Sequence, residues 1–235
     1  MEIMLLSLAI LAVLFLLTEY GKRASFRKLS SLLSKGEYDA YFAYLDTPLV
    51  KYLYPKYNRL YMKLNGLMFK EDHAQIQKMF DELLSYRITK KQRKDLVLKA
   101  FNYYIERGDK KNTKTLLDEI DTWENEDTQK KESHKLYDIF ILKKYNYIEE
   151  MEAVLDQLSG MNLGFMEYLL SLQYENKGDQ EKSKMYLERS QEHMLDAAKQ
   201  AVDTINEHKG DRKESAFRFF LPVFDRVVIH LCLLL

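Results

Sequence analysis

The sequence predicts an all-α fold, in which antiparallel helix pairs stack into a solenoid that follows one N-terminal transmembrane helix. The 235 residues include only 8 Gly and 3 Pro, too few for the frequent turns of a sheet-rich protein. An uncharged apolar run opens the chain, although 31% of all residues are charged. After this run, a polar turn recurs at intervals of about 35 residues between segments of helical apolar periodicity.

The opening apolar run, residues 3–18, predicts a membrane anchor within residues 1–20. Its length of about 16 residues is close to the ~17–25 residues of a spanning helix. A cleavable signal peptide would need basic residues before the run and a small-x-small site after it, and neither pattern is present. A buried core helix is the other alternative. The residues assigned to the membrane are Ile3, Leu5, Leu6, Leu8, Ile10, Leu11, Val13, Leu14, Phe15, Leu16 and Leu17.

The basic side chains that flank the anchor follow it in the sequence. Residues 21–28 form a basic juxtamembrane segment that we expect to contact anionic headgroups. By the positive-inside rule, this asymmetry predicts a single-pass membrane protein with its N-terminus outside and its repeat domain cytoplasmic. The one cysteine, Cys232, forms no intramolecular disulfide, which fits a reducing compartment. The expected membrane-surface residues are Lys22, Arg23, Arg27 and Lys28.

The recurring polar turns define the repeat. Successive turns are separated by 35, 37, 38 and 32 residues, measured at Gly36, Glu71, Gly108, Asn146 and Gly178. Two helices fit each interval, and one helix pair buries its apolar stripe only against its neighbours, so the pattern predicts a solenoid. Within this pattern, Asp46-Thr47-Pro48 predicts an additional short helix that reaches about Tyr54, because proline is tolerated in a first helical turn.

Two of the repeats carry small residues and a Gly-Asp turn at matching positions. One frame consists of Leu170, Ser171, Tyr174, Gly178, Asp179, Ser183, Leu187 and Ser190, and the other of Ala100, Tyr104, Gly108, Thr113, Leu117 and Ile120. This pattern resembles the tetratricopeptide repeat family. The resemblance covers residues 25–195, with about five repeats, of which two are well matched and three are degenerate.

The segment after the repeats, residues 196–235, is predicted to form a capping helix and an amphipathic C-terminal helix. Polar helix-forming sequence runs to about His208, and Lys209-Gly210 then ends it. In residues 216–235, apolar side chains recur on one helical face among several charges. This final helix closes the solenoid, lies on the membrane surface or docks on a partner, and the sequence leaves these alternatives open.

The family resemblance also implies a function. In tetratricopeptide repeat proteins, the first helices of successive repeats line a concave groove that binds a peptide or a partner helix. The resemblance therefore predicts a membrane-anchored cytoplasmic scaffold or adaptor for protein–protein interaction. A structural subunit of a larger membrane complex and a peptide-binding sensor are the alternatives. The predicted groove residues are Asp95, Leu98, Lys99, Asn102, Ile105, Lys135, Phe165, Tyr168, Leu172 and Glu175.

The sequence contains no motif for catalysis, cofactor binding or metal binding. The five histidines are scattered, and no nucleophile elbow, dinucleotide fingerprint or paired-carboxylate motif is present. We therefore expect no enzyme activity, no cofactor and no metal. The 36 basic residues balance the 36 acidic ones, so a nucleic-acid partner is not expected either. Residues 51–59 interleave basic and aromatic side chains, and we interpret them as an amphipathic packing segment.

Overall fold

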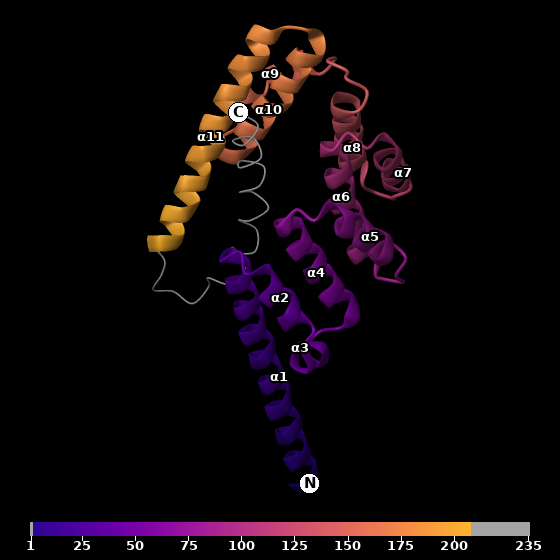
Figure 1. Ribbon diagram of the computed structural model, residues 1–235, viewed down its shortest axis with the longest axis vertical. Coiled ribbons are helices and arrows are strands. Elements are labelled where there is room, and N and C mark those ends of the chain that lie inside the picture. The colour runs from indigo at the N-terminus through magenta and orange to yellow at the C-terminus, as the bar shows by residue number, and fades with distance from the viewer. Residues whose placement is uncertain (1, 208–235) are drawn as a thin grey trace. The chain divides into compact units, whose positions relative to one another are not determined.

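The computed structural model describes residues 2–207, and the side chains from Ser7 to Thr204 except those of Ala9 and Val202. This part of the chain contains helices and no strand, which confirms the all-α class (Figure 1). The α-helices are α1 (Glu2–Ser34), α2 (Tyr38–Leu45), α3 (Pro48–Leu53), α4 (Lys56–Lys70), α5 (His73–Leu84), α6 (Lys90–Glu106), α7 (Lys110–Asp121), α8 (Asp127–Phe140), α9 (Ile148–Glu152), α10 (Gly160–Lys177) and α11 (Gln180–Glu207), with a 3₁₀ turn η1 at Leu155–Gln157.

The helices divide into two compact units, Met1–Arg87 and a second one that begins at Ile88. The region predicted as one run of repeats from 25 to 195 is thus divided between them. In the first unit, α1 packs against α2 and α3, α2 packs against α4, and α4 and α5 form a hairpin. In the second unit, α6 with α7 and α10 with α11 form hairpins, and α8 packs against α6, α7 and α10.

One turn geometry accounts for the repeating helix pairs. Four helices end at a residue with positive φ (Gly36, Glu71, Gly108 and Gly178). The N–H of the following residue then donates to the carbonyl five residues earlier, which is the signature of a Schellman motif. These bonds are Glu37 to Leu32 (2.9 Å), Asp72 to Leu67 (3.2 Å), Asp109 to Tyr104 (3.0 Å) and Asp179 to Tyr174 (2.9 Å).

The aspartates of three of these turns also start the next helix. The carboxylates of Asp72, Asp109 and Asp179 each accept the backbone N–H three residues later, at 3.2, 3.0 and 3.1 Å. One short stretch therefore ends one helix and caps the next, because an aspartate at an N-cap satisfies an otherwise unpaired N–H. The local sequence at these turns is sufficient to reverse the chain.

The turn predicted at Asn146 follows a different course. The left-handed residue there is Lys143 (φ 56°), and the N–H of Lys144 donates to the carbonyl of Asp138, six residues earlier. Only the five-residue α9 and the single turn η1 follow before α10. This predicted repeat consequently lacks a full second helix, because the wider turn at Lys143 does not lead directly into a helix with an N-cap side chain.

The short helix predicted after Asp46 is confirmed as α3. Thr47 caps it by accepting the N–H of Val50, and Pro48 occupies its first turn. Val50 and Leu53 are buried, with 0% and 6% of their surface exposed. The buried Tyr41 links α2 to α4, because its hydroxyl donates to the carbonyl of Met62 at 2.7 Å.

The two halves of α1 have different surroundings. Leu29 and Leu33, near its C-terminal end, lie in the core of the first unit. The N-terminal half extends beyond α2 and α3 (Figure 1). Its predicted membrane residues with described side chains are 52–65% exposed: Leu8, Ile10, Leu11, Val13, Leu14, Phe15, Leu16 and Leu17. A search limited to the described residues finds no helix that is both long and apolar enough to cross a membrane.

The second half of the predicted C-terminal region, residues 216–235, lies outside the described residues together with Cys232. The polar helix predicted before it is present as α11, which is described up to Glu207. Ser190 on α11 donates to the carbonyl of Gly164 on α10 at 2.7 Å, and both residues are buried. Small residues at this crossing allow the two backbones to approach closely.

Candidate functional site

One stripe of side chains along α6 carries several predicted groove residues. Asp95, Lys99, Asn102 and Glu106 follow one another at intervals of three or four positions, so they lie on the same side of the helix. Asp95, Asn102 and Glu106 are exposed, whereas Lys99 is half-buried. Burial lowers the pKa of Lys99, and the nearby carboxylate of Asp95 partly opposes this shift.

A second stripe runs along α10. Phe165, Tyr168, Leu172 and Glu175 share one side of this helix by the same spacing. Phe165 exposes 41% of its surface and Glu175 is exposed, while Leu172 packs against the core that α8, α10 and α11 enclose. The ring of Tyr168 lies 6.2 Å from that of Phe140 on α8, centroid to centroid. Aromatic side chains of two helices therefore meet at this stripe.

The acidic end of the α6 stripe lies close enough to Tyr168 to affect the ionisation of its hydroxyl. Burial and the negative charges of Glu106 and Glu175 raise the pKa of Tyr168 to about 12. The carboxylate of Glu106 thus acts on a ring that is 62 positions away in the sequence (168 minus 106). We call this surface the α6–α10 face: Asp95, Lys99, Asn102, Glu106, Phe140, Phe165, Tyr168 and Glu175. It presents the partly exposed ring of Phe165, with Glu175 ten positions later on α10, roughly 15 Å along the helix axis.

Two of the remaining predicted groove residues lie on or below this surface. Ile105 is only 3% exposed and belongs to the core, so its assignment to an accessible groove is wrong. Its position on α6 is three residues after Asn102, but the helix turns this side chain toward the interior of the second unit. Leu98 is half-buried.

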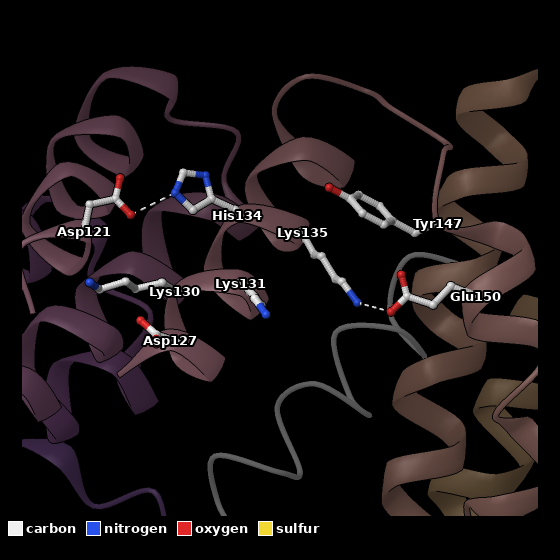
Figure 2. Close-up of a pocket in the computed structure, with 8 residues that line it drawn as sticks. All are labelled: Asp121, Asp127, Lys130, Lys131, His134, Lys135, Tyr147 and Glu150. Atoms are coloured by element: carbon white, nitrogen blue, oxygen red, sulfur yellow. Dashed lines mark hydrogen bonds and ion pairs between the residues drawn. The ribbon is translucent and has the colours of Figure 1, made fainter. Parts of the chain in front are cut away.

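Lys135, the last predicted groove residue, lies in an open hollow formed by the end of α7, α8 and α9 (Figure 2). His134 and Lys135 of α8 turn to carboxylates of different helices. His134 Nε2 lies 2.8 Å from Asp121 Oδ1 of α7, and the ammonium of Lys135 pairs with Glu150 of α9. The hollow is lined by Asp121, Asp127, Lys130, Lys131, His134, Lys135, Tyr147 and Glu150.

The charges of this hollow compensate one another. The hollow contains three carboxylates, three lysines and a histidine, and the pairs made by His134 and Lys135 link neighbouring helices. The ring of Tyr147 lies 5.5 Å below the ammonium of Lys135. These contacts indicate that the paired side chains of the hollow serve to link helices. The α6–α10 face therefore remains the candidate binding surface.

A buried polar cluster between α10 and α11 was missed from the sequence. Glu167 is fully buried, and its two carboxylate oxygens lie 2.9 Å from Arg189 Nε and 2.6 Å from His193 Nδ1. Arg189 and His193 are four residues apart on α11, so both reach the same side chain. This spacing was the available signal, but nothing in the sequence shows that Glu167 faces inward.

The residues predicted to lie at a membrane surface differ in their surroundings. Lys22 pairs with Glu19 at 2.7 Å, and the ammonium of Lys28 lies 4.2 Å from the centroid of Tyr44. Arg23 and Arg27 are exposed. Both arginines are therefore accessible to an anionic headgroup.

Comparisons with protein-family models, curated proteins and solved structures found no match to this chain. Among the described residues, no group of three or more His, Cys, Asp or Glu side chains is arranged to hold a metal ion. The α6–α10 face and α1 are therefore the features of the chain that bear on its function.

Proposed function

We propose that this chain is a membrane-anchored scaffold whose helical repeats bind a protein or peptide partner on the cytoplasmic side. The α6–α10 face is the observation that carries the proposal. Phe165 exposes an aromatic ring beside Tyr168, and Glu106 and Glu175 add negative charge to it. Exposed aromatic rings are frequent anchors in protein–protein interfaces.

The chemistry of this face suits a partner segment with apolar and basic side chains. An apolar residue of the partner packs on Phe165, and a Lys or Arg roughly 15 Å farther along the partner meets the carboxylates of Glu106 and Glu175. The tetratricopeptide resemblance supports the same surface, because α6 and α10 are the first helices of the two well-matched repeats. An extended peptide or an amphipathic helix both present side chains at suitable spacing.

The anchor is supported by the exposed apolar surface of α1. Apolar side chains from Leu8 to Leu17 point in all directions around the helix and are more than half exposed. In water, each would forgo roughly 1.5–3 kcal/mol of burial free energy, whereas a bilayer covers every side of the helix. The apolar run continues toward the N-terminus through residues 3–6.

Photo-crosslinking in intact membranes tests the binding surface. A photoreactive residue placed at position 165 of the full chain should capture a partner, and Glu106→Lys with Glu175→Lys should abolish that capture. Glu188→Lys on α11 is the matched control, since Glu188 is an exposed glutamate outside the α6–α10 face. Equal capture by the double variant and the wild type would contradict a binding role for this face.

Protease accessibility in sealed vesicles tests the orientation separately. The repeats should be digested only when the cytoplasmic face is exposed to protease. Digestion from the opposite face would move the partner to the extracytoplasmic side, without affecting the assignment of the binding surface.

A further inference from the structure

The short helix α3 presents two large side chains to solvent. Leu49 is 53% exposed and Tyr52 is 78% exposed, and their spacing of three places them on one face. The opposite face, with Val50 and Leu53, is buried against the first unit. The apolar side chains on one face of α3 are therefore buried. The other face exposes an aromatic and an aliphatic side chain that no described element covers.

Two contacts hold α3 at one level of α1. The hydroxyl of Tyr54 donates to the carbonyl of Lys22 at 2.7 Å. A methyl group of Leu53 lies 3.3 Å from the position that a Cβ atom would take at Gly21. Burial raises the pKa of Tyr54, and the charges of Tyr44 and Glu19 add to this effect. The end of α3 is thus fixed beside residues 19–22.

This level corresponds to the interface of a bilayer that contains the apolar run. Lys22 follows Leu17 by five positions, which is roughly 7.5 Å along a helix axis. Headgroups extend about 5–8 Å beyond the hydrocarbon core on each side of a bilayer. Tyr20, on the same turn of α1, is itself 68% exposed. The contact between α1 and α3 therefore falls at headgroup depth.

We propose that α3 lies in the membrane–water interface and places Leu49 and Tyr52 among lipid headgroups, as a second membrane contact beside α1. This inference rests on the proposed anchoring by α1. Tyrosine suits that depth, because its ring is apolar and its hydroxyl reaches water. Arg23 and Arg27, exposed on the adjoining turns of α1, add attraction to anionic lipids. The interleaved segment 51–59 thereby gains a role beyond packing.

Depth-dependent fluorescence quenching tests this arrangement in the full chain. Cys232 is the only cysteine, so Cys232→Ser allows single labels at Leu11→Cys, Tyr52→Cys or Ser34→Cys. Each labelled protein is reconstituted into vesicles of phosphatidylcholine and phosphatidylglycerol that carry a quencher at the headgroup or deep in the acyl chains. Ser34, exposed at the far end of α1, is the matched control, roughly 18 Å beyond Lys22.

We expect the deep quencher to extinguish the label at 11, the headgroup quencher to extinguish the label at 52, and neither to affect the label at 34. Quenching at 11 with an unquenched label at 52 overturns the role of α3 and leaves the anchor intact. Labels at 11 and 52 that both remain unquenched overturn the anchor and the inference together. Protection of the label at 52 in lipid-free protein, with concentration dependence, would show that a second copy covers α3 and would also overturn the inference.

Discussion

The two longest helices of the described residues, α1 and α11, extend past their partners in opposite ways. α1 has 33 residues and α11 has 28. The part of α1 that extends beyond the first unit is apolar and exposed on all sides. α11 continues past Ala197, which lies beside Gly160 at the start of α10, and its next residues are largely polar.

The side chains of α11 and of the N-terminal half of α1 differ in the same way. The α10–α11 pair is joined by the Gly164–Ser190 crossing and by Glu167 with Arg189 and His193. The N-terminal half of α1 presents aliphatic and phenylalanine side chains instead. A helix that extends past its partner is stable where its side chains match the surrounding medium, so this comparison distinguishes a helix suited to water from one suited to lipid.

The largest expected effect is that of a charge in the exposed half of α1. Leu11→Asp should weaken membrane insertion by about 3–4 kcal/mol, because an aspartate near the centre of a span is strongly disfavoured. The fraction of protein that resists alkaline carbonate extraction measures this loss. Gln200→Asp on α11 is the control and should leave extraction unchanged. Full retention of Leu11→Asp in the membrane would show that α1 does not lie in hydrocarbon.

A smaller effect is expected where α10 and α11 approach most closely. A Cβ atom at Gly164 would lie 2.6 Å from Met194 Cγ and 3.1 Å from the carbonyl oxygen of Ser190. Gly164→Val should therefore destabilise the second unit by about 1–3 kcal/mol. Fluorescence of Trp123, the only tryptophan, reports urea unfolding of this unit. Gln200→Val, at an exposed position of α11, reports the effect of a valine in a helix without the crossing, and equal stability of both variants would count against the tight crossing.

The smallest effect concerns Tyr168 on the α6–α10 face. Its pKa is raised from 10.0 to about 12, so the unfolded chain ionises first as pH rises. The contribution of Tyr168 to the free energy of unfolding is fully present below about pH 10. This contribution, on the order of 1 kcal/mol, is lost between about pH 10 and 12. Unfolding of wild type and Tyr168→Phe on either side of this range gives the difference. Tyr174 titrates in the same range in both proteins, so only the difference between them is informative. A pH dependence that Tyr168→Phe leaves unchanged would mean that this hydroxyl is not shielded.

The turns of the fold were predictable from the sequence because their causes are local. A residue able to adopt positive φ, followed by an aspartate that caps the next helix, reverses the chain within a few positions. Gly108-Asp109 and Gly178-Asp179 show this directly, and Glu71-Asp72 repeats it without glycine. The short helix α3 was predictable in the same way, from Thr47 and Pro48.

The candidate site was predictable only in part. The spacing of Phe165, Tyr168 and Glu175 on one helical side follows from the helix period. The position of Ile105 in the core and the inward direction of Glu167 do not follow from it, because both depend on which neighbouring helix covers them. The ion pairs of Lys135 and His134 join helices that follow one another in the chain, but the carboxylate that each side chain meets depends on how these helices pack.

Helix content, the recurrent turn and the contrast between the apolar start and the charged remainder are properties of short segments, so the order of residues is enough to specify them. The proximity of Glu106 on α6 to Tyr168 on α10, and the position of α3 beside residues 19–22 of α1, depend on how segments far apart in the chain pack. Such contacts arise from packing of whole helices, where burial and side-chain shape choose among many arrangements that the local sequence permits equally. For the opening run of α1, the tertiary structure added that its described large apolar side chains, from Leu8 to Leu17, stay uncovered by the rest of the first unit.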